Sequence, residues 1–177
     1  MEKVKIGVIG CGALAESIYL PLLTEHPGYQ VVFLADISTI RARALAMRYQ
    51  VSSWFESHQE GIKNTHAEAV VLALPNRFHA QTAVDCLNSG LHVLVEKPMA
   101  TCVADAQRMI DASQANGRVL AVGLVRRFYT TTQFIKEVID TCLFGNLKSI
   151  SFEEGCVFNW PIKTDSLINK VVSGGGS

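Results

Sequence analysis

One stretch near the start of the chain carries the strongest indication of its fold: Val4-Lys5-Ile6-Gly7-Val8-Ile9-Gly10-Cys11-Gly12-Ala13-Leu14-Ala15. Its first six residues are typical of a strand, and an apolar helical pattern follows the glycines. Gly10 would allow a tight turn, Gly12 a close approach of the backbone to a pyrophosphate, and Ala15 close packing of helix on strand. Glycine turns also occur without a ligand, but this one lies between a strand and a helix, as a dinucleotide site requires. We therefore predict a dinucleotide-binding turn, with further cofactor contacts from Cys11, Ala13 and Leu14.

Strands and helices alternate along the first 124 residues. Apolar, β-branched runs mark strands at 4–9, 31–35, 69–74, 91–95 and 119–122. Apolar residues at helical spacing mark the helices between them: Leu14/Ile18/Leu22, Ala42/Leu45/Ala46/Tyr49, Ala80/Ala83/Val84/Leu87 and Ala106/Ile110. We expect Pro21 to kink or shorten the first helix, and Thr101 to cap the last. The alternation predicts right-handed βαβ units, and hence an α/β fold with a Rossmann-type, doubly wound parallel sheet.

The pattern changes after Gly123. We predict a helix over Thr131–Thr141 and a long strand over Leu147–Phe158, with no helix after it to fold it back. The chain thus divides into a Rossmann domain at 1–124 and, at 125–177, the first helix and strand of an incomplete second α/β domain. A strand without sheet neighbours recruits other chains, so we expect a homo-oligomer.

The composition narrows the class of protein. Of 177 residues, 49% are apolar and 18% charged, as in a packed globular protein. Sixteen basic residues balance sixteen acidic ones, which argues against a nucleic-acid or membrane-surface role. The five cysteines are scattered without a C-x-x-C pair, so we predict neither a metal site nor a disulfide framework. Met1 runs almost directly into a strand, and the apolar stretches are too short to cross a bilayer, so we expect a cytoplasmic protein.

Asp36 ends the second predicted strand. There its carboxylate could accept both ribose hydroxyls of an adenosine, and it would repel the 2′-phosphate of NADP. NADP sites usually bring an arginine to this place, and Arg41 and Arg43 are near in sequence. On the face of a helix, however, such arginines are more often solvated charges. The sequence therefore predicts NAD as the cofactor rather than NADP.

The segment after the strand at 69–74 would pass beside the cofactor. It is Leu74-Pro75-Asn76-Arg77-Phe78-His79, in which Asn76 could donate a hydrogen bond to the ribose or the pyrophosphate. We predict cofactor contacts from Leu74, Pro75, Asn76 and His79. Two alternatives stay open: Asn76 is also a common turn residue, and His79 could cap a helix or lie in the core.

Glu96-Lys97-Pro98 closes the apolar run Leu91–Val95. Ligands of open α/β sheets bind outside this carboxyl end of the strands. Pro98 restricts Lys97 to extended geometry, and Glu96 could orient the ammonium or hold a backbone turn. A lysine at a strand end is usually solvated, but one held here could donate a hydrogen bond to a substrate oxygen and stabilise alkoxide charge. We predict Lys97 as the catalytic residue of a nicotinamide-dependent oxidoreductase, with Glu96 beside the cofactor.

Together these residues resemble the Gfo/Idh/MocA family, which takes its name from glucose–fructose oxidoreductase, inositol dehydrogenase and a protein of rhizopine catabolism. The resemblance covers essentially the whole chain. It is carried by the glycine turn, Asp36, Leu74-Pro75-Asn76 with His79, Glu96-Lys97-Pro98, Arg126-Arg127-Phe128, Phe158-Asn159-Trp160-Pro161 and Gly174-Gly175-Gly176. The Glu-Lys-Pro element is more specific than the glycine turn.

The resemblance implies an NAD(P)-dependent dehydrogenase of a sugar, polyol, cyclitol or related carbonyl compound. Its Rossmann domain would be followed by a substrate and oligomerisation domain built on a large, mostly antiparallel sheet. By this similarity Lys97 lies beside the nicotinamide and the substrate hydroxyl, Arg127 shapes the cofactor site, and Trp160 lines the substrate side. A solvated basic pair at Arg126-Arg127 and a packing role for Trp160 are the alternatives.

The chain departs from the family at its end. In similar proteins the triple glycine introduces a segment with an Asp and a His that complete the catalytic site, and Ser177 precedes any such residues. The resemblance is thus to the N-terminal half of a family member, and we expect this chain alone to be inactive. The alternative is a non-catalytic module of the same fold that senses NAD(P) and docks a partner protein. Lys97 favours the enzyme, the missing half favours the module, and a methyltransferase would leave Glu96-Lys97-Pro98 unexplained.

Overall fold

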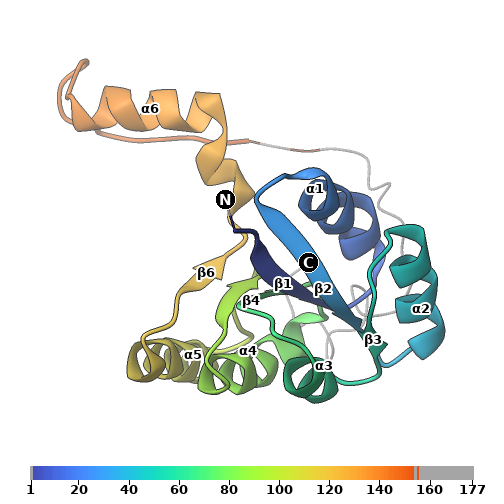
Figure 1. Cartoon of the computed structure of the whole chain (residues 1–177). Helices are drawn as coiled ribbons and strands as arrows, with labels where there is room; N and C mark the ends of the chain where they lie inside the picture. The colour runs from blue at the N-terminus through green and yellow to red at the C-terminus, as the bar shows by residue number, and fades with distance from the viewer. Residues whose placement is uncertain (1, 154, 156–177) are drawn as a thin grey trace. The chain divides into compact units, whose positions relative to one another are not determined.

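The computed structural model describes residues 2–153 and residue 155, which form two compact units (Figure 1). The first unit extends to Gly123 and the second begins at Leu124. The first contains β1 (Val4–Ile9), η1 (Ala15–Tyr19), α1 (Leu20–Glu25), β2 (Tyr29–Ala35), α2 (Thr39–Arg48), β3 (Trp54–Phe55), α3 (His58–Asn64), β4 (Ala69–Leu72), η2 (Asn76–Phe78), α4 (His79–Asn88), β5 (His92–Val95), α5 (Val103–Asn116) and β6 (Leu120–Val122). The second contains η3 (Val125–Phe128) and α6 (Thr130–Asp140). The turn η1 is π-helical, and η2 and η3 are 3-10 turns.

The sheet of the first unit has six parallel strands in the order β3-β2-β1-β4-β5-β6. The chain moves outward from β1 to β3, crosses back, and then moves outward in the other direction from β4 to β6. The strand order therefore reverses between β1 and β4, where doubly wound sheets bind ligands outside the carboxyl ends of their strands. The predicted Rossmann-type sheet is confirmed.

Different helices cover the two faces of this sheet. On one face η1, α1 and α2 pack on β1 and β2 through a cluster that includes Leu20 and Leu45. On the other face α4 and α5 pack on β4 and β5 through a cluster that includes Leu87 and Met109. Figure 1 shows α1 and α2 on one side of the strands and α3, α4 and α5 on the other. Strands buried on both faces explain the uninterrupted apolar runs in the sequence.

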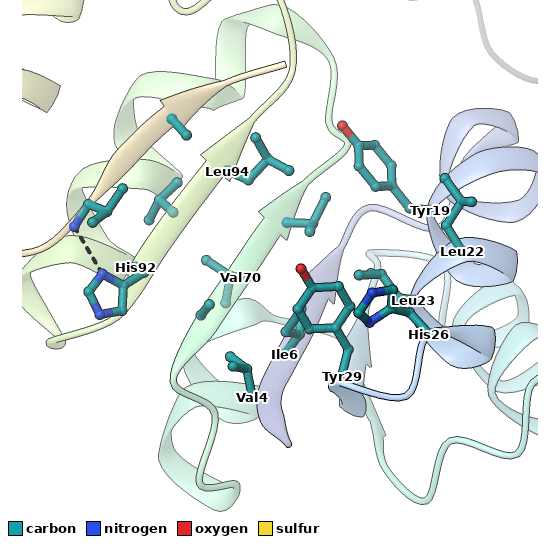
Figure 2. A pocket seen from close by; sticks show the side chains of 15 residues that line it. Val4, Ile6, Tyr19, Leu22, Leu23, His26, Tyr29, Val70, His92 and Leu94 are labelled. Carbon is teal, nitrogen blue, oxygen red and sulfur yellow. Dashed lines mark hydrogen bonds between the residues drawn. The ribbon is translucent and has the colours of Figure 1, made fainter. Parts of the chain in front are cut away.

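The described residues cover the face that carries α1 only in part. Over its β4, β5 and β6 portion lies an open groove of about 470 Å³, lined mostly by apolar side chains (Figure 2). Tyr19 and Leu22 line it from the helix side, and His92 and Leu94 line it from β5. The groove leaves part of the apolar surface of the sheet open.

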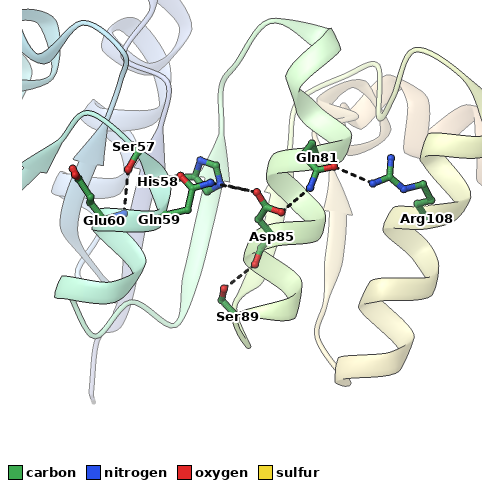
Figure 3. Close-up of polar contacts among 8 residues, drawn as sticks. All are labelled: Ser57, His58, Gln59, Glu60, Gln81, Asp85, Ser89 and Arg108. Carbon is green, nitrogen blue, oxygen red and sulfur yellow. Dashed lines mark hydrogen bonds and ion pairs between the residues drawn. The ribbon is translucent and has the colours of Figure 1, made fainter.

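The opposite face is held together by a close packing contact and by polar side chains. The Phe33 ring is fully buried between Gly7 and Gly61. A Cβ would lie 2.2 Å from the ring if added at Gly7 and 2.5 Å from it if added at Gly61, so both positions require glycine. Asp85 of α4 accepts hydrogen bonds from its neighbours, with His58 Nε2 at 3.0 Å and Gln81 Nε2 at 2.7 Å. Gln81 Oε1 in turn accepts one from Arg108 Nη2 at 3.0 Å. These contacts link α3, α4 and α5 (Figure 3).

The first helix differs from its predicted pattern. The prediction that Leu14, Ile18 and Leu22 form its buried face is wrong, because Ile18 and Leu22 are 40% and 62% exposed. The cause is the π-helical turn, in which the Leu20 N–H donates to the Ala15 carbonyl and one extra residue shifts the buried face. Pro21, which has no N–H to donate, follows directly. Pro21 lies in the first turn of α1, where a missing N–H is tolerated, and the helix continues to Glu25.

Other boundaries differ in smaller ways. The short elements β3 and α3 were not among the predicted ones, and Cys102 rather than Thr101 is the N-cap of α5. The helix predicted over Thr131–Thr141 is confirmed by α6. The strand predicted over Leu147–Phe158 is not formed by residues 147–153 or 155, since none of the described residues pairs with them, and its remaining residues lie outside the described part. None of the helices described is long and apolar enough to cross a membrane.

Candidate functional site

The two glycines of the first turn have different surroundings. Gly10 has a φ of +95°, and a Cβ there would lie 2.3 Å from the Ala73 carbonyl oxygen. Its N–H donates to the Ala35 carbonyl at 2.8 Å. A Cβ at Gly12 would meet no atom of the described residues within 4 Å. Gly10 is therefore required by the protein itself, whereas Gly12 borders open space at the carboxyl edge of the sheet, which fits a cofactor pyrophosphate passing there.

The start of the following helix also faces this space. Ala13 and Leu14 are half-buried and form its first residues. The first N–H groups of a helix have no partner within it and carry a partial positive charge. This arrangement suits the phosphates of a dinucleotide.

Asp36 follows β2 and accepts three hydrogen bonds from the protein. The Cys11 N–H donates to Oδ2 at 2.8 Å, and Ser38 N and Arg41 Nη2 donate to Oδ1 at 2.8 Å and 3.0 Å. Only 8% of the Asp36 side chain is exposed. A carboxylate has about four acceptor positions, so about one remains for a ligand, which is fewer than the two that both ribose hydroxyls of an adenosine would need.

Arg41 is not a solvated charge, and this corrects the expectation from its place on a helix. Its guanidinium pairs with Asp36 at 3.0 Å, and its Nε is buried with no hydrogen-bond partner among the described residues. Arg43, by contrast, is exposed and lies over the Trp54 ring. If Asp36 binds the ribose, as the sequence predicts, a guanidinium beside it would lie near the 2′-phosphate of NADP, so Arg41 bears on the choice between NAD and NADP.

Cys11 contributes its backbone to the site rather than its thiol. The side chain is 2% exposed. Burial, and then the Asp36 carboxylate, raise the pKa of the Cys11 thiol to about 12, against a smaller lowering by Arg41. The thiol is therefore protonated at neutral pH and is a poor nucleophile.

The segment after β4 reaches the same edge of the sheet. Leu74, Pro75 and Asn76 are half-buried there, and Asn76 begins the turn η2. His79 begins α4 and is fully buried, with Nδ1 2.8 Å from the Pro98 carbonyl oxygen and Nε2 2.8 Å from that of Leu74. Both ring nitrogens thus face the protein. His79 joins the loop after β4 to the loop after β5.

Glu96, Lys97 and Pro98 follow β5, and the Lys97–Pro98 peptide bond is cis. The Glu96 carboxylate accepts a hydrogen bond from the Tyr19 hydroxyl at 2.6 Å and one from the Lys97 backbone N–H at 3.1 Å. Glu96 therefore holds the backbone of Lys97 and not its ammonium. The Lys97 side chain is exposed and forms no ion pair within the described part of the chain, so its charge is available to a ligand.

Tyr19 is a residue of this site that the sequence patterns do not indicate. It lies in the π-turn, 77 positions before the carboxylate that it contacts. Burial, and then the hydrogen bond to Glu96 and its charge, raise the pKa of the Tyr19 hydroxyl, so it remains a donor at neutral pH. The nearby Pro21 signals an irregular helix, but no local pattern links that helix to Glu96.

The predicted residues of the first unit thus gather at the carboxyl ends of β1, β2, β4 and β5, around the point where the strand order reverses. Arg127 is exposed in η3 of the second unit, and Trp160 lies outside the described residues. Across the described residues there is no group of three or more His, Cys, Asp or Glu side chains that could hold a metal ion.

Comparisons with known proteins point to the same fold. The model of the Gfo/Idh/MocA family, described as an oxidoreductase family with an NAD-binding Rossmann fold, matches residues 4–124. An inositol 2-dehydrogenase of Salmonella typhimurium (strain LT2) is 32% identical over 143 residues, which are 80% of this chain and 43% of that protein. The chain spans about half the length of the curated relatives it matches.

Two solved structures are similar as well. The WlbA dehydrogenase from Bordetella pertussis, in complex with NADH and UDP-GlcNAcA, is 28% identical with a TM-score of 0.77, over 81% of this chain and 44% of that one. The 3-ketoreductase KijD10 from Actinomadura kijaniata, in complex with NADP and TDP-benzene, is 26% identical with a TM-score of 0.73, over 79% of this chain and 43% of that one. One of these relatives is thus in complex with NADH and the other with NADP.

Proposed function

Because the chain belongs to the Gfo/Idh/MocA oxidoreductase family with its NAD-binding Rossmann fold, we propose that it is the cofactor-binding half of a dehydrogenase. The reaction would transfer a hydride between a nicotinamide and a sugar, polyol or cyclitol. One observation carries this proposal. Lys97 presents an ammonium with no ion-pair partner in the described part of the chain, at the edge of the sheet that also holds the glycine turn and Asp36.

In this proposal the residues of the chain divide the work along the sheet edge. The turn Gly10–Gly12 and the helix start after it hold the pyrophosphate, and the last acceptor position of Asp36 takes a ribose hydroxyl. The bound nicotinamide supplies the hydride chemistry. Lys97 donates a hydrogen bond to the substrate oxygen and stabilises the negative charge that develops there. The roles proposed for Arg127 at the cofactor and for Trp160 on the substrate side come from the family resemblance alone.

We propose NAD as the preferred cofactor over NADP. Asp36 places a negative charge where the 2′-phosphate of NADP would lie. Arg41 could offset that repulsion, but its guanidinium already pairs with Asp36 at 3.0 Å. The net environment of the ribose is therefore less favourable to an additional phosphate.

The role of Lys97 can be tested without turnover, through the charge of the cofactor. The nicotinamide ring of NAD⁺ is positive and that of NADH is neutral, so an ammonium beside the ring favours NADH. Two unit charges at ~6 Å in a medium of effective dielectric constant about 40 repel by roughly 1.4 kcal/mol, which is tenfold in affinity. We expect Lys97→Met to lower the ratio of NADH to NAD⁺ affinity about tenfold in calorimetric titrations.

Lys63→Met is the matched control for this experiment. Lys63 is exposed in the last turn of α3, before the amino end of β4 and away from the proposed site. The affinity ratio should stay unchanged in this variant. An unchanged ratio in Lys97→Met as well would show that Lys97 does not lie beside the nicotinamide.

A second candidate function is a non-catalytic module of the same fold that binds NAD(P) and docks another protein. The buried, hydrogen-bonded Asp36 and the glycine turn beside it would serve binding without turnover equally well. Hydride transfer separates the two candidates. A sensor should bind NAD(H) but produce no NADH, even when the substrate domain of a family member is added. The enzyme half should produce NADH once that domain is supplied.

The proposed partners are a polyhydroxylated small molecule and further copies of the chain, with no nucleic acid and no membrane. Phe134 and Ile135 of α6 are 64% and 49% exposed, and apolar surface of this kind favours self-association. Light scattering at increasing protein concentration checks this, and a constant monomer mass would contradict it.

A further inference from the structure

We propose that Tyr19 and His79 are positioning residues that hold Lys97 from its two sides, an inference that rests on the proposed role of Lys97. The lysine side chain is long and flexible, and within the described residues no ion pair fixes its ammonium. What the protein fixes instead is the backbone on which this side chain stands. Glu96 and Pro98, its two neighbours in sequence, are each anchored to another element of the fold.

The anchor on the N-terminal side is a relay from Tyr19 through Glu96. The Tyr19 hydroxyl donates to Glu96 Oε1 at 2.6 Å, and Glu96 Oε2 accepts the Lys97 N–H at 3.1 Å. Gly123 closes the other side of the carboxylate, since a Cβ there would lie 3.0 Å from Oε1. The carboxylate is therefore confined by a donor, by the backbone of Lys97 and by a residue with no side chain.

The anchor on the C-terminal side is the buried imidazole of His79. Its Nδ1 lies 2.8 Å from the Pro98 carbonyl oxygen, and its Nε2 lies 2.8 Å from that of Leu74. A neutral ring donates to one of these oxygens and an imidazolium donates to both. The loop that carries Lys97 is thus tied to the loop after β4, which lies on the switch point of the sheet.

The two anchors come from opposite layers of the fold. Tyr19 belongs to the helix that packs with the β1–β2 cluster, and His79 belongs to α4, which packs with the β4–β5 cluster. Figure 2 shows Tyr19 on its helix beside the apolar groove. A backbone held from both layers limits the directions that the Lys97 side chain can take while it leaves the ammonium free.

The test uses the same affinity ratio that reports on Lys97. Tyr19→Phe removes one oxygen atom, and His79→Gln keeps a donor near the Nε2 position while it gives up the contact with Pro98. In both variants we expect the ratio of NADH to NAD⁺ affinity to fall about threefold to tenfold, the worth of one hydrogen bond. His79→Asn, which keeps a donor near the Nδ1 position, should recover most of the ratio.

Amide hydrogen exchange supplies a readout without cofactor. We expect exchange at the Lys97 N–H to accelerate about threefold to tenfold in Tyr19→Phe, while the N–H of Val8 in the core strand β1 is unaffected. Tyr49→Phe is the matched control. Like Tyr19, Tyr49 donates one hydrogen bond from its hydroxyl, in this case to the Glu16 carbonyl of the first helix at 2.9 Å and not to Glu96. It should change neither the affinity ratio nor exchange at Lys97.

Each outcome separates the inference from the proposed function. If Lys97→Met lowers the ratio and Tyr19→Phe does not, the positioning role is wrong and the role of Lys97 stands. If Lys97→Met has no effect, the proposed function fails, and the inference fails with it. If the His79 variants do not fold, the affinity ratio of Tyr19→Phe decides the inference. This variant keeps the aromatic ring of residue 19 and its packing, so it should fold.

Discussion

At the adenosine end of the proposed site the charged side chain itself is held, because Asp36 accepts three hydrogen bonds and is 8% exposed. At the nicotinamide end the hydrogen bonds go to Glu96 and Pro98, the neighbours of Lys97, and its ammonium is left exposed. A group that only binds can be fixed in advance, which lowers the entropic cost of binding. A group that must respond to charge developing in a reaction needs its donors free, since only interactions stronger in the transition state accelerate it.

The largest expected effect is a loss of stability at the glycine turn, which belongs to the adenosine end of the proposed site. Gly10→Ala should lower the free energy of unfolding by about 3 kcal/mol, because φ is +95° and the new Cβ would lie 2.3 Å from the Ala73 carbonyl oxygen. Gly12→Ala is its matched control, with a Cβ that meets no atom of the described residues within 4 Å. The free energy of unfolding of Gly12→Ala should stay within about 0.5 kcal/mol of that of the original chain. Its affinity for NAD should fall about tenfold or more, because the new methyl group would occupy space needed by the pyrophosphate. Urea unfolding of Gly10→Ala that matched the original chain would contradict this geometry.

The next effect separates binding at one end from chemistry at the other. At a hundredfold excess over its dissociation constant, NAD should stabilise the chain by about 2.7 kcal/mol, seen as a thermal shift. The same chain should form no measurable NADH with inositols or sugars. The family resemblance implies an acid–base histidine that follows the triple glycine, and such a group is typically worth about 10²–10⁴-fold. NADH production would mean that the chain contains its own acid–base group.

A smaller effect tests whether Asp36 selects the cofactor as well as holding it. The original chain should bind NAD(H) more tightly than NADP(H), and Asp36→Ala should reduce that preference about tenfold, or ~1.4 kcal/mol, by removing the repulsion of the 2′-phosphate. Arg41→Ala should act in the opposite direction, because it removes the cation beside Asp36. Calorimetric titration with both cofactors measures this. Equal affinities in the original chain would overturn the assignment of Asp36.

The smallest effect concerns the burial of the adenosine end. Burial chiefly raises the pKa of Cys11, and likewise of Cys86 in α4, from 9.0 to about 12. Their contribution to stability is complete below pH 9 and is lost as the pH rises toward 12, because the unfolded thiols ionise first. For each of the two thiols, the free energy of unfolding should fall by about 1 kcal/mol between pH 9 and pH 10. Urea unfolding of Cys11→Ala should show a shallower loss over this range, and an unchanged slope would count against the burial of this thiol.

Most of the fold could be predicted because long apolar strands and amphipathic helices have clear periods. The short strand β3 has only Trp54 and Phe55, too few residues for any period, and the helix α3 contains a single large apolar residue, Ile62. The first helix was placed correctly but its buried face was not, because the π-turn changes the period from which the face is inferred. The strand over Leu147–Phe158 was predicted from its composition, but a strand also requires a neighbour to pair with.

The site could be predicted where a residue's role depends on its position in a motif. The glycine turn, Asp36 and Lys97 each follow a strand that the sequence makes evident, and parallel strands bring their carboxyl ends together. The contacts of Tyr19 with Glu96, of His79 with Pro98 and of Arg41 with Asp36 depend on side-chain packing between elements. Two of these three contacts join residues distant in the chain, so no local pattern contains them.

The π-turn of the first helix has a consequence for the comparison of this chain with its relatives. A π-turn holds one residue more than an α-helical turn, and such turns are frequent at functional sites. One residue advances an α-helix by about 100°, so the extra residue within Ala15–Tyr19 decides which side chain faces Glu96. We expect relatives without a π-turn here to need a gap in this helix when they are aligned, and to present a different residue to the glutamate.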